Sequence, residues 1–323
     1  MSNHVQTLRV RVAGKHAIAQ DIALFELASD DSSPLPPFHA GAHVDVMLPG
    51  GITRQYSLCN APDGAARYQI AVLKEVSGRG GSRAMHEAVS VGDLLTVSAP
   101  RNRFPLDEAA AHSLLLAGGI GITPLLSMAE QLSVLGRNFE LHCCARTRER
   151  MPFRERIAAS PYAARVHLHV DDGVPEQRLH LGVLLGTLRP GTHVYTCGPQ
   201  GFMEAVLASA RSAGWPEAQL HWESFGAAPA QRSDDGGFEV QLARSGRVVP
   251  VAASQTVVAA LAAHGVEVST SCEQGVCGTC LTRVLEGEAD HRDLYLSPDE
   301  QAANDQFLPC CSRSKTARLV LDL

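Results

Sequence analysis

The sequence has no long hydrophobic run and no concentration of basic charge. No apolar stretch approaches the roughly 20 residues that span a bilayer, so we expect no membrane segment. The net charge of −6 argues against nucleic acid as the main partner, because phosphate binding needs a basic surface. The opening residues, MSNHVQTLRV, lack the basic segment and apolar core of a signal peptide. We therefore expect a cytoplasmic protein.

Internal repeats and low-complexity tracts are also lacking. The 323 residues allow two or three domains with hydrophobic cores of their own. The nine cysteines are odd in number and unevenly spread, and a cytoplasmic chain keeps its thiols reduced. These observations argue against a disulfide framework.

The chain divides into three regions and a linker. Residues 1–105 contain short apolar strands separated by turn residues, which predicts an all-β barrel or sandwich. In residues 106–226 strands alternate with helices, as in SLLLAGG followed by TPLLSMAEQLSVLG, which predicts a parallel sheet. Residues 227–236 are small and polar, as in a flexible linker. Residues 237–323 predict a mixed α+β module with a hairpin and a short helix.

A cysteine cluster in STSCEQGVCGTC is the most specific motif. Cys272, Cys277 and Cys280 give the spacing C-x4-C-x2-C, and Cys310 follows after 29 intervening residues. This is the spacing of a plant-type 2Fe–2S cluster, and the small residues around it allow backbone N–H groups to approach the cluster sulfurs. Structural zinc sites usually pair two tight knuckles, so zinc fits less well. Spacing alone leaves Cys311 open as the alternative fourth ligand.

The other cysteines carry less information. Cys143 and Cys144 lie in a predicted buried strand and Cys59 at the end of another, so we expect structural roles for them.

A glycine-rich loop, GGIGITP, connects a predicted strand to a helix and suits a pyrophosphate at the helix N-terminus. It departs from the dinucleotide fingerprint, because Pro124 replaces a third glycine and the second strand runs into Arg146 and Arg148 instead of an acidic residue. Those arginines could pair with a 2′-phosphate, bind the pyrophosphate or be ordinary solvated surface charges. The sequence CGP at residues 197–199 also ends a strand, and two such loops predict a ligand crevice.

The stretch RQYSL places Arg54, Tyr56 and Ser57 on a strand of the first region. Such residues are either ordinary surface residues or a binding site in which the arginine binds a phosphate and the aromatic ring packs against a planar ligand. Residues 77–82, SGRGGS, offer glycine amides and Ser82, as in an anion-binding nest. These residues alone do not identify a flavin.

Taken together, these modules resemble the phthalate dioxygenase reductase family. The resemblance covers essentially the whole chain and rests on the stretches RQYSLCN, GRGGS, PRNRFPLD, AGGIGITPLLSMAEQL, CGPQGFM, ESFGA, SCEQGVCGTC, GEADHRD and LPCCSR. It implies an antiparallel β-barrel flavin domain, a Rossmann-like NAD domain with a parallel sheet, and a β-grasp ferredoxin domain.

The resemblance also implies roles for individual residues. It places Ser57 and Cys197 at the reacting centre. It implies flavin contacts from Arg54, Tyr56, Ser57, Gly80, Gly81, Ser82 and Phe225. It implies nicotinamide contacts from Gly119, Gly121, Thr123, Cys197, Gly198 and Pro199. It favours Cys310 over Cys311 as the fourth cluster ligand, because the family pattern is Cys-x-Ser-Arg, here Cys310, Ser312 and Arg313.

The implied cofactors are FMN, NADH and a 2Fe–2S cluster. The implied partner is a terminal oxygenase, typically of Rieske type and acting on an aromatic acid or ether, reached through a transient contact. The sequence leaves three alternatives: a stand-alone flavin or ferric reductase, a non-enzymatic iron–sulfur redox sensor, and a zinc-stabilised binding module.

Overall fold

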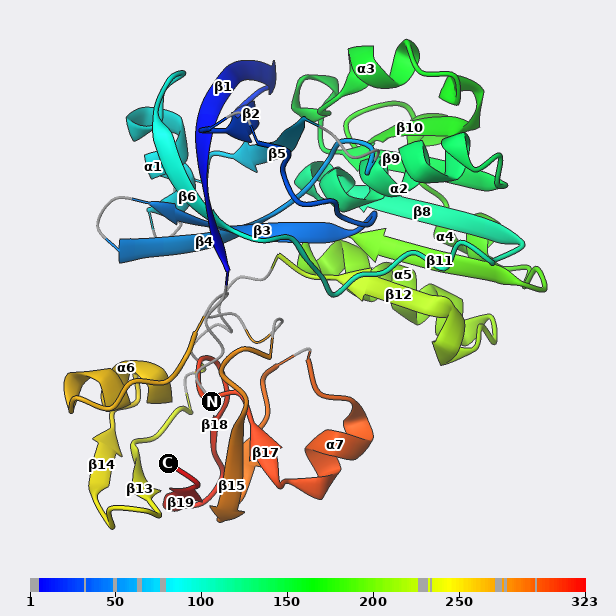
Figure 1. Cartoon of the computed structure of the whole chain (residues 1–323). Coiled ribbons are helices and arrows are strands. Elements are labelled where there is room, and N and C mark those ends of the chain that lie inside the picture. The colour runs from blue at the N-terminus through cyan, green and yellow to red at the C-terminus, as the bar shows by residue number, and fades with distance from the viewer. Residues whose placement is uncertain are drawn as a thin grey trace. The chain divides into compact units, whose positions relative to one another are not determined.

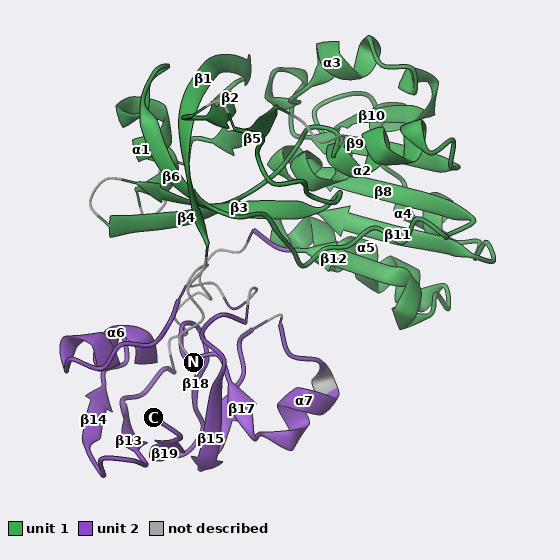
Figure 2. Ribbon diagram, viewed as in Figure 1, with its two compact units in different colours: residues 1–223 green, residues 224–323 purple. Residues whose placement is uncertain are grey.

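The computed structural model describes residues 6–31, 33–48, 51–62, 66–75, 80–225, 232, 234–270, 275, 278–293 and 295–323, apart from the side chain of residue 298. It forms two compact units, residues 1–223 and residues 224–323, which Figure 2 shows in different colours. Within the described residues, each helix is too short or too polar to cross a bilayer.

The first unit begins with an antiparallel sheet of seven strands. Their order is β4-β3-β6-β1-β2-β5, with β7 beside β3. The strands are β1 (Thr7–Ala19), β2 (Ile22–Ser29), β3 (Ala42–Leu48), β4 (Ile52–Ser57), β5 (Arg67–Leu73), β6 (Leu94–Ser98) and β7 (Arg101–Asn102). A single antiparallel bridge, Leu58 to Ile70, brings the two edges of the sheet together. The antiparallel sheet is as predicted, and a closed barrel stays a prediction.

A helix, α1 (Gly81–Ala88), interrupts this region, which corrects the all-β expectation for residues 1–105. Gly80 adopts a left-handed conformation with φ 81° and starts the helix, which buries Met85 against the core of the sheet. The sequence expectation took the glycine-rich stretch before it as an isolated loop.

The second sheet of the first unit is parallel and has the strand order β10-β9-β8-β11-β12. Its strands are β8 (His112–Gly118), β9 (Phe139–Ala145), β10 (Val166–Val170), β11 (Thr192–Cys197) and β12 (Leu220–Glu223). Its α-helices are α2 (Ile122–Val134), α3 (Arg154–Ala158), α4 (Leu181–Leu185) and α5 (Gln200–Ser212). Short 3-10 turns are η2 (Gly119–Gly121), η3 (Arg148–Arg150), η4 (Ala163–Arg165), η5 (Pro175–Gln177) and η6 (Glu217–Gln219).

Helices cover the two faces of this parallel sheet, as Figure 1 shows. Helices α4 and α5 pack their apolar residues against Leu114, Leu116 and Val194. Helix α2 is buried along most of its length and packs on the side of the antiparallel sheet. The strand order reverses between β8 and β11, so the loops after these two strands flank the crevice where α/β sheets bind ligands.

Direct hydrogen bonds join the two sheets of the first unit. Arg156 of α3 donates to the Gln69 side chain of β5 at 2.9 Å and also to Glu130 of α2 at 2.9 Å. The backbone N–H of Gln20 donates to the Glu149 carbonyl at 2.9 Å. The two sheets therefore form one compact unit.

The second unit holds a mixed sheet in the order β14-β13-β19-β15-β17 and a two-stranded sheet, β16-β18. Its strands are β13 (Phe238–Leu242), β14 (Val248–Val251), β15 (Thr282–Glu286), β16 (Ala289–Asp290), β17 (Gln306–Phe307), β18 (Arg313–Ser314) and β19 (Arg318–Leu321), and its helices are α6 (Val257–Ala263) and α7 (Pro298–Ala303). Helix α6 packs Val257 and Leu261 into the sheet core. Thr256 caps it by accepting a hydrogen bond from the Ala259 N–H.

Candidate redox site

Two residues that the sequence predicts at the reacting centre, Ser57 and Cys197, lie near Glu223 at the carboxyl ends of the parallel strands. Cys197 ends β11, and its register partner on β12 is Glu223. Ser57, at the end of β4 in the antiparallel sheet, donates a hydrogen bond from its hydroxyl to a Glu223 carboxylate oxygen at 3.1 Å. The site is therefore assembled from both sheets of the first unit.

Glu223 was missed by the sequence reasoning. Burial raises the pKa of its carboxyl to about 7, and the Ser57 hydrogen bond opposes that rise. Glu223 can therefore gain or lose a proton near neutral pH. The available signal was the acidic residue at the end of the last parallel strand, in the stretch ESFGA.

Cys197 is fully buried, and burial followed by the nearby Glu223 charge raises its pKa well above the ordinary thiol value. The thiol is thus neutral at physiological pH. It is suited to packing beside a ligand and unsuited to nucleophilic attack, which requires the thiolate.

The loops after β8 and β11 contact each other through their backbones. A Cβ at Gly121 would lie 2.3 Å from the Cys197 carbonyl oxygen, and a Cβ at Gly198 would lie 2.8 Å from the Gly118 Cα. Side chains at these positions would force the two loops apart. Glycine is therefore required here for close packing of the predicted nicotinamide crevice.

The exposed side of the same loop is open. Gly119 has φ 56°, and no described atom lies within 4 Å of the position its Cβ would take. Thr123 is buried and donates its hydroxyl to the Ile120 carbonyl at 3.1 Å, so it holds the turn together. Pro199 precedes α5 as its N-cap. A ligand approaching this edge would meet backbone before side chains, which suits a pyrophosphate.

Arg54 lies along the start of α1. A Cβ at Gly81 would lie 2.5 Å from the Arg54 Cγ, so the arginine side chain runs directly over the glycine backbone. The Ser82 hydroxyl accepts a hydrogen bond from the Glu75 N–H at 3.1 Å, which leaves its own O–H available to donate. A guanidinium, a hydroxyl and a helix N-terminus together fit a phosphate group.

Tyr56 is partly buried and packs against the core of the antiparallel sheet. Burial raises the pKa of its phenol, so the ring is neutral. Phe225 is also partly buried, but it belongs to the second unit. Arg146 and Arg148 follow β9 and are exposed.

The cysteine cluster is described in part. Cys272 and Cys277 lie outside the described residues. Cys280 and Cys310 are both buried in one small apolar cluster with Leu296 and Leu308.

Cys311 belongs to the same apolar cluster. Its thiol donates to the Leu308 carbonyl at 3.6 Å. A Cβ on Gly275, which has φ 75°, would lie 2.5 Å from the Cys311 Sγ. The Cys311 side chain thus fills the space beside the glycine of the cysteine loop.

The end of the predicted linker is fixed to the cysteine-rich unit. Asp235, counted in the linker of residues 227–236, is ion-paired with Arg292, whose Nη1 lies 3.0 Å from Asp235 Oδ2. Hydrogen bonding to Arg292 lowers the pKa of Asp235 to about 2. Arg313 donates to the Gly236 carbonyl at 3.0 Å. The ordered module thus includes residues that the composition assigned to the linker.

Of the remaining cysteines, Cys59 and Cys143 are buried and Cys144 is partly buried, as their expected structural roles require. The Cys59 thiol donates to the Gln69 carbonyl at 3.3 Å.

Comparison with known proteins defines the class. Residues 240–315 match the family model of the 2Fe-2S iron-sulfur cluster binding domain. Similarity to reductases extends beyond this domain over almost the whole chain, including the two sheets of the first unit. The chain is therefore an oxidoreductase with a 2Fe–2S ferredoxin domain.

The chain belongs to the phthalate dioxygenase reductase family, the reductase components of oxygenase systems. It is 43% identical over 317 residues to the phthalate dioxygenase reductase of Burkholderia cepacia, covering 98% of this chain and 97% of that one. It is 51% identical over 316 residues to the vanillate O-demethylase oxidoreductase of Pseudomonas sp. (strain HR199 / DSM 7063), covering 98% and 100% of the two chains.

A solved structure agrees with this assignment. Phthalate dioxygenase reductase, described as a modular structure for electron transfer from pyridine nucleotides to [2Fe-2S], matches with a TM-score of 0.79 and 42% identity over 98% of each chain. The family, the mixed fold class and the 2Fe–2S cluster predicted from the sequence are confirmed. The cofactor set predicted from the resemblance, FMN, NADH and the cluster, is that of this family.

Proposed function

We propose that this chain transfers electrons from NADH through FMN to its 2Fe–2S cluster and on to a Rieske-type terminal oxygenase or O-demethylase. The proposed substrate class of that oxygenase is an aromatic acid or ether. The observation that carries the proposal is the meeting of Ser57 with Glu223, because it joins the predicted flavin strand to the predicted nicotinamide crevice. The 51% identity to a vanillate O-demethylase oxidoreductase supports the substrate class.

The proposed division is residues 1–105 for flavin, residues 106–226 for nicotinamide and residues 237–323 for the cluster. A bound flavin would accept a hydride from nicotinamide and release its electrons singly to a cluster that takes one at a time. In the proposed arrangement, Arg54 and Ser82 hold the flavin phosphate. Ser57 and Glu223 hold or take up a proton beside the reacting edge.

The nicotinamide crevice is proposed to use Gly119, Gly121, Gly198 and Pro199 as a backbone surface, with Thr123 maintaining the turn. The neutral, buried Cys197 thiol is proposed to pack against the nicotinamide. The exposed Arg146 and Arg148 would face the adenosine end of the dinucleotide, and we propose NADH because the family resemblance favours it. Tyr56 and Phe225 are proposed to border the flavin ring.

The proposed cluster ligands are Cys272, Cys277, Cys280 and Cys310. The burial of Cys280 and Cys310 in one apolar cluster supports their inclusion. The local hydrogen bond of Cys311 supports leaving it out. The contact with the oxygenase is proposed to be transient and salt-sensitive, as is usual for electron-transfer partners.

The first experiment is an anaerobic titration of the purified protein with NADH, followed in the visible spectrum. We expect flavin and cluster absorbance both to bleach, and extraction of the cofactor to yield FMN. Bleaching of the flavin alone would favour a stand-alone flavin reductase. Absence of NADH oxidation would favour a redox sensor, and colourless protein with stoichiometric zinc would favour a zinc module.

The second experiment tests the partner. Terminal oxygenases that demethylate vanillate or dihydroxylate phthalate are supplied separately with this reductase and NADH. We expect formaldehyde from the vanillate reaction, at a rate that falls with added salt. Electron delivery to the phthalate enzyme alone would contradict the O-demethylase assignment while leaving the reductase function intact.

A further inference from the structure

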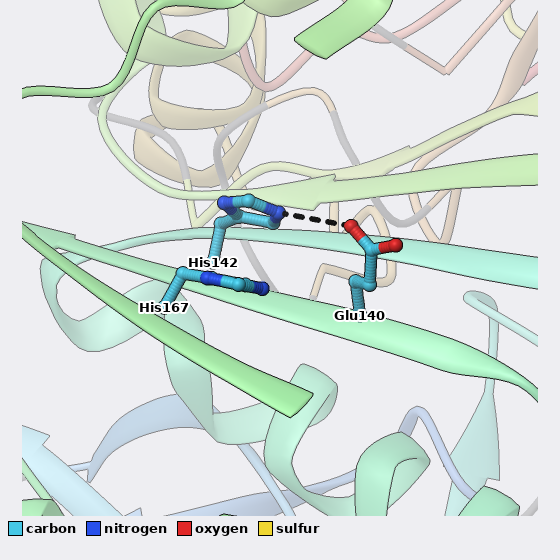
Figure 3. Close-up of side chains that lie close together, drawn as sticks. All are labelled: Glu140, His142 and His167. Atoms are coloured by element: carbon cyan, nitrogen blue, oxygen red, sulfur yellow. Dashed lines mark ion pairs between the residues drawn. The ribbon is translucent and has the colours of Figure 1, made fainter. Parts of the chain in front are cut away.

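A cluster of imidazoles lies on the parallel sheet away from the redox site. His142 on β9 is the register partner of His167 on β10, so both side chains lie on the same face of the sheet. Glu140 precedes His142 by two positions on β9 and shares that face. Figure 3 shows the three side chains together, with the ion pair between His142 and Glu140 marked. The sequence signals were the alternating patterns ELH and HLH.

The donor atoms of these three residues converge. One ligand atom from each of Glu140, His142 and His167 lies within 4.8 Å of the other two. The His142 Nε2 and a Glu140 carboxylate oxygen are 3.7 Å apart, too far for a hydrogen bond. Tetrahedral zinc with ligand bonds near 2.0–2.1 Å separates its ligands by about 3.3 Å. Because the His142 and His167 rings are stacked with 19° between their planes, the exposed His167 ring would rotate out of the stack to turn its nitrogen toward the same ion.

His142 is the residue that the protein alone leaves unexplained. It is 6% exposed, and its Nε2 has no hydrogen-bond partner among the described residues. Its other ring nitrogen, Nδ1, lies 3.0 Å from the His169 Nε2. If His142 Nδ1–H donates to His169, the lone pair on His142 Nε2 lies in the plane of the ring, on the side of the Glu140 carboxylate. A metal-ligating histidine usually has its second nitrogen held in this manner.

The His142 ring lies between two other imidazoles. The His142 ring stacks on His167 at a centroid separation of 4.6 Å and on His169 at 5.2 Å. Burial and these two neighbours lower the pKa of His142 to about 4.

Glu140 has other partners that must be weighed. Arg189 lies 3.4 Å from its Oε1, and the His112 Nε2 lies 3.9 Å from the same oxygen. The Arg189 side chain is 59% exposed, so this ion pair is weak and screened. It engages Oε1, whereas Oε2 faces His142. The carboxylate can therefore keep Arg189 and still supply a ligand.

A hollow of about 400 Å³ opens beside these residues, lined by His112, Glu140, Arg165 and His167 among others. It lies at the amino ends of β8, β9 and β10, whereas the glycine loops follow the carboxyl ends of β8 and β11. Three protein ligands leave a fourth coordination position, and the hollow gives water access to it.

We propose that Glu140, His142 and His167 bind a divalent transition-metal ion of the Zn²⁺ class, with His169 orienting His142 and water completing the coordination. Two imidazoles and a carboxylate suit zinc, whereas magnesium and calcium prefer oxygen ligands only. The site is separate from the 2Fe–2S cluster and does not depend on the proposed function.

The test uses protein loaded with flavin and cluster, so that the cluster cysteines are occupied. Zinc sulfate is titrated calorimetrically into wild type, His167→Asn and Glu140→Gln after passage over chelating resin, with cluster absorbance checked. We expect one strong site per chain in wild type and at least tenfold weaker binding in both variants. Zinc should raise the melting temperature of wild type and not of the variants.

The matched control is His221→Asn. His221 and His193 form a second imidazole pair on the same sheet, with Nε2 and Nδ1 3.0 Å apart. The His193 Nε2 lies 3.8 Å from an Asp107 carboxylate oxygen, but among the described residues these donor atoms do not form a convergent set like that of Glu140, His142 and His167. This control should bind zinc as wild type does. Weak zinc binding by wild type would overturn the proposal, as would equal affinity in wild type, His167→Asn and Glu140→Gln.

Discussion

The Ser57 hydroxyl lies 3.1 Å from the Glu223 carboxylate, although 166 positions separate the two residues in the chain. One residue ends an antiparallel strand and the other ends a parallel strand. Their hydrogen bond connects the two sheets of the first unit at the candidate redox site. It also supplies a hydroxyl and a titratable carboxyl at the proposed flavin edge.

Replacing Ser57 with Ala should slow reduction of the bound flavin by NADH by about 100-fold, the scale expected when a lost contact misplaces the reacting edge by about 1 Å. The Kd for NADH should change little, because the nicotinamide loops are untouched. Stopped-flow absorbance measures both quantities. Ser57→Thr keeps the hydroxyl and should recover part of the rate. Equal rates in wild type and Ser57→Ala would remove Ser57 from the reacting centre.

Glu223 should impose a pH dependence on electron transfer. Its pKa is raised to about 7, so the carboxyl is mostly protonated at pH 6 and mostly ionised at pH 8. Only the ionised form could accept, through Ser57, the proton that a reduced flavin would release as it gives up its electrons. We expect the NADH-to-cytochrome c rate to rise through about pH 7 in wild type and to lose that rise in Glu223→Gln. A profile unchanged by the substitution would assign the titration to another group.

Gly121→Ala should disrupt the nicotinamide crevice, because the new Cβ would lie 2.3 Å from the Cys197 carbonyl oxygen. Overpacking of this kind costs about 1–3 kcal/mol. We expect a lower melting temperature and a higher KM for NADH. Gly201→Ala is the control, since no described atom lies within 4 Å of its Cβ position. Similar effects from both substitutions would point to a general loss of stability instead of a clash.

Cys310→Ser and Cys311→Ser should separate the two adjacent thiols. We expect the first to abolish cluster absorbance and the EPR signal of the reduced cluster, with NADH-to-ferricyanide activity retained at the flavin. The second should keep the cluster, because the Cys311 thiol donates to the Leu308 carbonyl. A normal cluster in Cys310→Ser and a lost one in Cys311→Ser would reverse the ligand assignment.

Asp235→Ala should destabilise the second unit. The side chains of Asp235 and Arg292 are only 4% and 7% exposed, so the substitution leaves a buried guanidinium with fewer partners. Breaking such a pair costs about 3–5 kcal/mol, and the remaining Asp290 contact to Arg292 should reduce that figure. Cluster retention during heating measures the effect. Asp234→Ala, at an exposed neighbour, should behave as wild type.

Local spacing was sufficient to predict much of the fold and part of the site. The strand SLLLA, the helix after it and the spacing of Cys272, Cys277 and Cys280 are properties of short segments, so the sequence displays them directly. Helix α1 was missed because its eight residues follow a glycine-rich stretch whose loop character dominated the interpretation.

The relationships between distant segments were not predictable in the same manner. Glu223 gains its role from the register of β12 beside β11 and from the approach of Ser57. His142 and His167 become neighbours only through the pairing of β9 with β10. Asp235 looked like linker because its neighbours are small and polar, whereas its ion pair with Arg292 depends on tertiary folding.

The hydrogen bonds of Arg156 to Gln69 and Glu130 have a consequence for turnover. They tie the two sheets of the first unit together, so a hinge motion between the sheets would have to break them. A relative motion of the two sheets would therefore cost the net free energy of these hydrogen bonds, about 0.5–3 kcal/mol each.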